Sequence, residues 1–289
     1  MPRTDRRFPA LTNAMRRIIP LLAFPLLATG AMAQVSELGL TGGTTFYIGD
    51  INPTRYYPKN THFGGGLFYR YNINDRYAFR LQGLYGKLEA WDSDSDDPVQ
   101  QLRNLGFRTN LFEASALFEI NFFKYRALKD GRKWSPFVFA GLCYFRTNPQ
   151  NLLDDTWYDL QPLGTEGQTI GGGEGYQLNQ IGIPFGAGLK LALSTRIDLQ
   201  LEWGLRRTYT DYIDDVSGTY HDNAALAEQS GPLTALLADP GPLRTTGINT
   251  GRARGDSNTK DWYQYTGLTI SLLLTRFTEC DAIWDKHRK

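Results

Sequence analysis

The residues that could take part in acid–base or nucleophilic chemistry are few, and most of them fall in one long polar segment. The groups closest to His221 in the sequence are Asp214, Asp215, Ser217 and Asp222. A nucleophile and its base must be held within hydrogen-bond reach by a rigid frame, and closeness along a loop does not provide one. The segment, with His62 near the same expected rim, therefore does not indicate an enzyme.

Metal and cofactor sites are not predicted either. The sequence has neither a Cys/His cluster nor a His-x-x-x-His spacing. The glycine run 171–175 lacks the strand and helix that a phosphate-binding loop requires. Arg254-Gly255-Asp256 spells an integrin-recognition tripeptide, but Gly and Asp are favoured in turns, so chance explains it.

The remaining charged side chains are positioned by segments in which apolar and polar residues alternate. In the clearest one, Leu199, Leu201 and Trp203 share one face, whereas Gln200 and Glu202 share the other. A period of two predicts a β-strand. Because a bilayer requires every backbone polar group to be paired internally, such strands cross it only as a closed barrel whose polar face points inward.

Eight segments follow this pattern. They are 36–47, 62–72, 76–90, 107–123, 135–147, 178–193, 196–209 and 261–275. Short and long connections alternate between them, as in outer-membrane barrels, which have short periplasmic turns and long outer loops. We therefore predict an all-β fold, an eight-stranded antiparallel transmembrane barrel in the outer membrane with both termini in the periplasm. We also expect a bulge at Pro184, because proline cannot donate to a β-ladder.

The first 33 residues are predicted to be an export signal. Five arginines precede an apolar run that ends at Ala31-Met32-Ala33. The expected organisation is a signal peptide at 1–33, a barrel at 34–277 and a periplasmic tail at 278–289. Removing the signal changes the net charge from +1 to about −3, which is not the balance of a nucleic-acid-binding protein.

The interior of an eight-stranded barrel is only wide enough for side chains to fill, so charged residues there are expected to neutralise one another. A diffusion channel is therefore not predicted. The charged side chains expected in this interior are Arg70, Arg80, Arg108, Glu113, Glu119, Lys190, Asp198, Glu202 and Arg206.

The expected periplasmic side has two notable features. The turn 124–134 is strongly basic and suits an acidic partner, although a solvated turn explains it equally well. Its cations are Lys124, Arg126, Lys129, Arg132 and Lys133. The tail carries Trp284 and Cys280, and Cys280 is too far from Cys143 for a disulfide. Cys280 is therefore either free or bridged to another protein.

Short sequence motifs along the whole mature chain resemble those of PorG-like outer-membrane proteins of the type IX secretion system of Bacteroidota. They include Tyr47-Ile48-Gly49-Asp50-Ile51-Asn52, Arg108-Thr109-Asn110-Leu111-Phe112-Glu113, Ile183-Pro184-Phe185-Gly186, segment 210–220 and Arg254-Gly255-Asp256-Ser257. The resemblance implies a non-catalytic component that has no cofactor and associates with a periplasmic ring of a PorK-like lipoprotein and a PorN-like protein.

Two functions follow as hypotheses. In the first, the basic turn and the tail bind and anchor this ring to the outer membrane, with Cys280 as a possible disulfide to the lipoprotein. In the second, a small barrel of another class acts in envelope tethering or surface recognition through its long loops 148–177 and 210–260.

Overall fold

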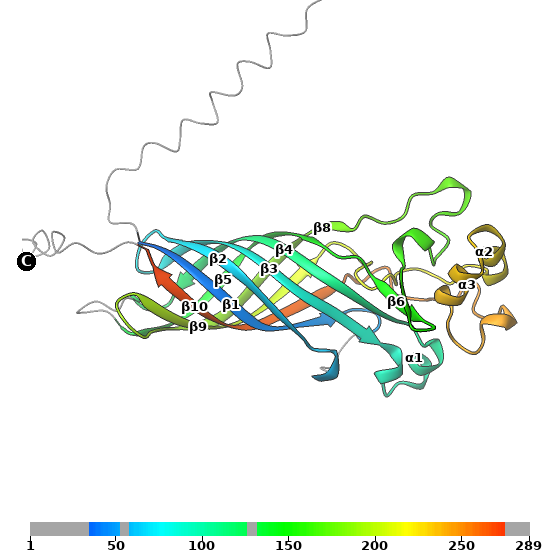
Figure 1. Ribbon diagram of the computed structural model, residues 1–289, viewed down its shortest axis with the longest axis horizontal. Helices are drawn as coiled ribbons and strands as arrows, with labels where there is room; N and C mark the ends of the chain where they lie inside the picture. The colour runs from blue at the N-terminus through cyan, green and yellow to red at the C-terminus, as the bar shows by residue number, and fades with distance from the viewer. Residues whose placement is uncertain (1–34, 53–57, 126–131, 275–289) are drawn as a thin grey trace, which may run out of the picture. The chain divides into compact units, whose positions relative to one another are not determined.

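The computed structural model describes residues 35–52, 58–125 and 132–274 and contains a closed antiparallel β-barrel (Figure 1). Its eight strands are β1 (Val35–Ile48), β2 (His62–Asn72), β3 (Tyr77–Trp91), β4 (Gly106–Asn121), β5 (Trp134–Arg146), β8 (Asn179–Ala192), β9 (Ile197–Thr208) and β10 (Trp262–Leu273). The predicted fold class is confirmed, and each of these strands begins and ends within two residues of its predicted range.

The barrel closes because its first and last strands pair with each other. β1 pairs with β2 on one side and with β10 on the other, where Glu37 faces Leu273 and Ile48 faces Trp262. Every other strand pairs with its neighbours in the barrel, and the β3–β4 pairing completes the ring. No strand of the ring is left with an open edge, which satisfies the backbone inside a bilayer.

Side chains alternate strictly between the two faces of the wall. On β3, Phe79 and Leu81 are more than half exposed, whereas Arg80 between them is 1% exposed. The exterior is therefore apolar and the interior charged, which is the reverse of a soluble barrel and suits a lipid environment. In the part of the chain that the structure describes, no helix is long and apolar enough to cross a membrane.

The connections differ at the two ends of the barrel. At one, the turn end, short connections span 73–76, 122–133 and 193–196. Side chains shape two of them: Asn74 Oδ1 accepts from the amides of Arg76 and Tyr77 at 2.8 and 2.9 Å, and Ser194 Oγ accepts from the Ile197 amide at 3.0 Å.

The other end, the loop end, carries the long connections 49–61, 92–105, 147–178 and 209–261. They contain elements that the sequence analysis did not predict: the hairpin β6 (Gln150–Leu153) and β7 (Thr156–Asp159), and the helices α1 (Pro98–Arg103), α2 (Asn223–Gln229) and α3 (Pro232–Ala238). The three helices gather at this end in Figure 1.

The bulge expected at Pro184 does not form. Ala140 pairs with Phe185 and Cys143 with Gly182, so β5 and β8 each advance by three residues and the register is unchanged. Pro184 also keeps its place opposite Arg206 on β9. The missing amide is accommodated by an interruption of the β5–β8 ladder at Pro184 and Ile183, without an inserted residue.

Candidate functional site: a filled lumen beneath a loop cap

The middle of the lumen is organised around one carboxylate. Glu119 on β4 is fully buried and contacts three cations: Arg70 Nε at 2.9 Å, Arg80 Nε at 3.0 Å and Lys190 Nζ at 2.5 Å. These cations come from β2, β3 and β8, so the carboxylate links strands around the ring. A buried charge is tolerated when it is paired and hydrogen-bonded in this way.

A second group of acids completes the pairing of those cations. Glu37 Oε2 lies 2.6 Å from Arg70 Nη1, and Glu202 Oε2 lies 2.5 Å from Arg80 Nη1. Gln200 also accepts from Arg70, and its amide donates to Glu202 at 2.9 Å. The network therefore spans six strands, and neither arginine lacks an acidic neighbour.

The other predicted lumen residues face inward as well. Toward the loop end, Arg206 Nε lies 3.2 Å from Glu113 Oε2, which also accepts from the Tyr263 hydroxyl at 2.9 Å. Toward the turn end, Asp198 is buried beside Tyr125. Of the residues named from the sequence, Arg80, Glu113, Glu119, Lys190, Asp198, Glu202 and Arg206 all lie in the lumen.

Arg108 was expected in the lumen, and this expectation is wrong. On β4 the inward positions are odd-numbered, so Arg108 faces outward, where its guanidinium lies 3.2 Å from the centre of the Trp157 ring. Trp157 belongs to the β6–β7 hairpin, whose presence the sequence analysis missed. The alternation itself indicated the outward direction, since Leu111 and Glu113 share the inward face with Thr109.

An apolar plug fills the lumen at the loop end. It joins barrel residues such as Tyr47, Phe107 and Tyr263 to side chains from the long connections. The contributions from the connections are Ile51, Leu105, Ile213 and Val216, each at most 2% exposed. With the charged midsection below it, the plug fills the barrel interior with side chains, as its strand number requires.

Above the plug, Arg254 holds three loop segments together. Its Nη1 lies 3.1 Å from Glu166 Oε1 and also donates to the carbonyl oxygen of Asp215, while its Nε donates to the Ala238 carbonyl at 3.1 Å. Arg254 is 2% exposed. The Arg-Gly-Asp run therefore presents no free arginine for an adhesion receptor.

Two buried carboxyl groups share one hydroxyl at the base of this cap. The Tyr47 hydroxyl lies 2.5 Å from Asp214 Oδ2 and 2.7 Å from Asp261 Oδ1. Burial, followed by the charge of Asp261, raises the pKa of Asp214 well above its usual range. Burial likewise raises the pKa of Asp261, and nearby Asp211 and Asp50 add to the effect. A hydroxyl has only one proton to donate, so the cluster suits a shared proton between the two acids.

The groups considered for catalysis are not brought together. His221 Nδ1 lies 3.2 Å from the neighbouring Asp222 carbonyl, whereas the Ser217 hydroxyl bonds to Asp211. His62 pairs with Glu89 at 3.0 Å on another part of the rim. Among these contacts, neither His221 nor His62 is hydrogen-bonded to the Ser217 hydroxyl.

Of the cations predicted in the turn 124–134, the structure describes Lys124, Arg132 and Lys133, and all three are exposed. The guanidinium of Arg132 stacks over the ring of Phe123, 4.2 Å from its centre. Arg126, Lys129, Cys280 and Trp284 lie outside the described residues. Cys143 is a buried free thiol, 3.8 Å from the Tyr263 hydroxyl.

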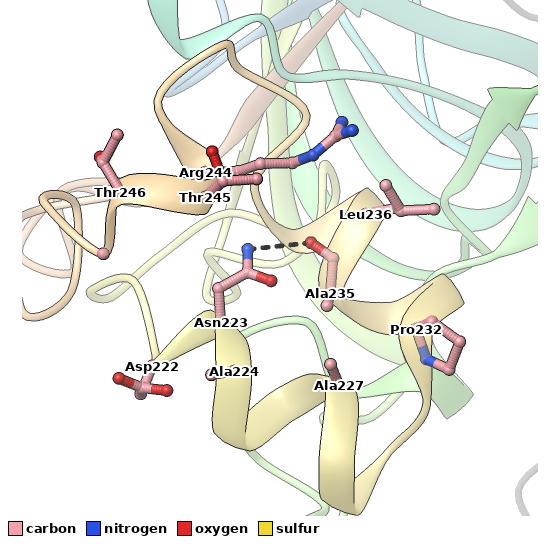
Figure 2. Close-up of a pocket in the computed structure, with 11 residues that line it drawn as sticks. Asp222, Asn223, Ala224, Ala227, Pro232, Ala235, Leu236, Arg244, Thr245 and Thr246 are labelled. Atoms are coloured by element: carbon pink, nitrogen blue, oxygen red, sulfur yellow. Dashed lines mark hydrogen bonds between the residues drawn. The ribbon is translucent and has the colours of Figure 1, made fainter.

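The last long connection also forms an open groove of about 590 Å³ between α2, α3 and segment 244–247 (Figure 2). Its polar groups mostly serve the fold: Asp222 accepts from the Ala225 amide at 2.8 Å, and Asn223 donates to the Ala235 carbonyl at 3.0 Å. The sequence carried a signal for these helices, because Asp222 precedes an alanine-rich run and Pro232 opens the next one.

Comparison with solved structures finds small barrels. The N-terminal barrel domain of Pseudomonas aeruginosa OprF matches at 13% identity and a TM-score of 0.32, with 85% of this chain and 100% of that chain covered. Neisserial surface protein A matches at 9% identity and a TM-score of 0.38, with 84% and 99% covered. Ail of Yersinia pestis matches at 10% identity and a TM-score of 0.38, with 84% and 99% covered.

No curated protein matches the sequence. One family does, over residues 16–231, and its description is "Domain of unknown function (DUF6089)". Because this match covers more than half of the chain, the chain belongs to the DUF6089 family.

Proposed function

We propose that this protein is a non-catalytic outer-membrane β-barrel that anchors a periplasmic ring of a type IX secretion machine. The observation that carries the proposal is the filled lumen, with Glu119, Arg70, Arg80 and Lys190 paired inside it. A barrel without an open interior acts through its ends and its outer wall.

In this proposal the turn end and both termini lie in the periplasm. Lys124, Arg132 and Lys133 form an exposed cationic surface there, and such a surface attracts an acidic partner and speeds its association. The partners are a PorK-like lipoprotein and a PorN-like protein, as the resemblance to PorG-like proteins implies. Arg126, Lys129, Trp284 and Cys280 extend the contact, with Cys280 as the candidate for a disulfide.

The test is co-purification from native outer membranes in mild detergent. A turn-end variant carries Lys124→Gln, Arg132→Gln and Lys133→Gln, and a matched loop-end variant carries Arg244→Gln, Arg252→Gln and Lys260→Gln. All six side chains are exposed, so neither set threatens the fold. We expect ring proteins to be recovered with wild type and the loop-end variant, and lost or strongly depleted with the turn-end variant.

The disulfide is tested separately by comparing wild type with Cys280→Ala on non-reducing gels. A reducible band that disappears in the variant supports the bridge, and co-purification without such a band removes only the bridge. A wild-type barrel that purifies without ring proteins contradicts the anchoring function.

A second candidate is surface recognition or envelope tethering through the long loops. The groove between α2 and α3 favours it, because Ala227, Pro232 and Leu236 give it apolar walls and Arg244 lies at its edge (Figure 2). Replacing Leu236 with Glu should abolish binding of a surface ligand without changing recovery of ring proteins. Loss of ring proteins in that variant would contradict this division of roles.

A further inference from the structure

Small residues interrupt the lipid-facing wall of the barrel between β3 and β4. Most outward positions carry large apolar side chains, such as Leu67, Leu81 and Leu142. Gly83 and Ala114 instead lie side by side on β3 and β4, both facing outward. A Cβ atom added to Gly83 would meet nothing within 4 Å, so the gap is not filled by a neighbouring side chain.

A groove of about 680 Å³ lies over these two residues. Leu67 borders the gap on β2, and Tyr144 borders it on β5, directly across from Ala114. Tyr85 and Phe112 line it one outward position nearer the loop end. The groove is thus apolar at its deep end and aromatic toward the loop end, where aromatic side chains of barrels meet the membrane interface. Its volume is in the range of small-molecule sites.

Arg146 lines the groove at the edge nearest the loop end of the barrel. Arg146 is exposed, pairs in register with Phe112 and Asn179, and forms no ion pair with any residue that the structure describes. Arg146 is two residues beyond Tyr144 on β5, which faces Ala114 in the floor of the groove. The side chain of Arg146 therefore leaves the backbone about 7 Å further along the strand than that floor. An arginine fork matches a phosphate group in geometry and charge.

From this placement we propose that the groove binds one phosphate-bearing membrane lipid, with an acyl chain over Gly83 and Ala114 and the phosphate on Arg146. Along the barrel axis, the groove changes from polar to apolar in the same order as a phospholipid does. Arg146 and Asn179 lie where the phosphate would lie, the rings of Tyr85 and Phe112 come next, and Gly83 lies where the acyl chain would lie. A single cation beside a short groove suits one lipid molecule. A protein partner would instead be expected to cover a much larger area.

The experiment uses the full-length barrel purified in detergent and titrated with phosphatidylglycerol, with the bound lipid counted by native mass spectrometry. Diacylglycerol, which lacks the phosphate, is the comparison lipid. Gly83→Leu places a side chain over the floor, where an added Cβ meets nothing within 4 Å, and Arg146→Gln removes the cation. The controls are Ala187→Leu and Arg207→Gln, which alter outward, exposed positions that do not line the groove.

We expect wild type and both controls to hold phosphatidylglycerol more tightly than diacylglycerol. Gly83→Leu and Arg146→Gln should each weaken the phospholipid by about tenfold, since loss of a charge-assisted hydrogen bond or of an apolar contact costs on the order of 1.4 kcal/mol. Equal retention by Gly83→Leu and wild type overturns the proposal, and so does equal binding of the two lipids to wild type. A dimer that Gly83→Leu dissociates also overturns it, because the groove would then be an interface between copies.

Discussion

The midsection of the lumen and the cap at the loop end solve the same problem, the burial of charge, in opposite ways. In the lumen, Glu119 and Glu202 each contact cations on other strands. In the cap, Asp214 and Asp261 share a tyrosine hydroxyl and lie near further acids. Cations thus balance the carboxylates of the lumen, whereas in the cap burial and neighbouring acids raise the pKa of Asp214 and Asp261. We therefore expect the stability of the cap to depend on pH.

The largest effect is expected when the central lumen acid is removed. Glu119→Gln leaves Arg70, Arg80 and Lys190 facing one another without their shared carboxylate, and breaking a buried ion pair costs about 3–5 kcal/mol. The free energy of unfolding, measured by urea titration of the barrel in vesicles, should fall by that amount. The control is Glu228→Gln, an exposed change on α2. Equal stability of the two variants would show that the lumen charges do not hold the barrel.

Arg254 provides the corresponding test in the cap. Arg254→Gln removes its contacts with Glu166 and the backbone of Asp215 and Ala238, so the loops should loosen by about 2–3 kcal/mol while the barrel stays folded. Limited proteolysis should cut segment 209–261 faster, and urea unfolding of the strands should change little. An equal loss of barrel stability would mean that cap and wall form one cooperative unit.

The pH dependence of the cap follows from the raised pKa values. Burial raises the pKa of Asp211 and of Asp215 from 3.8 to about 6, and it also raises the pKa of Asp214 and of Asp261 well above the usual range. The folded cap therefore keeps protons that the unfolded cap releases. Cap stability is highest below about pH 4 and falls as the pH rises, by up to about 1.4 kcal/mol per pH unit for each group.

The amides of Ile213 and Val216 report this directly, because they donate to Asp261 at 2.8 Å and to Asp214 at 2.9 Å. Their hydrogen-exchange protection factors, corrected for intrinsic rates, should fall between about pH 4 and pH 7. Asp214→Asn mimics the protonated acid and should flatten the profile. Protection that rises with pH would contradict the assigned direction of the shifts.

The sequence predicted the wall far better than the cap. Alternation with period two placed all eight barrel strands and the inward charges, because one face of each strand must suit lipid and the other a narrow interior. Arg108 was assigned to the lumen although the alternation places it outward, and the hairpin on which it stacks, inside a long loop, was not predicted. The plug was missed for a similar reason: Ile213 and Val216 stand among polar residues, and only the folded loop brings them over the barrel mouth. The periodicity of a sequence reports local secondary structure and does not indicate contacts between residues that are far apart in the chain.

The smallest effect is expected for removal of the N-cap of α2. This change distinguishes the stability of the helix itself from the contribution of the buried carboxyl groups of the cap. Asp222→Ala removes the carboxylate that accepts from the Ala225 amide at the start of α2, a change that costs about 1 kcal/mol locally. Exchange should speed up in α2, whereas protection of the Ile213 and Val216 amides should stay unchanged at every pH. Because Asp222 is exposed and Asp214 is buried, the two aspartates differ in environment and not in chemical type. If Asp222→Ala also shifts the pH profile of Ile213 and Val216, the helices and the carboxyl cluster open together, and the proton-sensitive lid extends over the whole of segment 209–261.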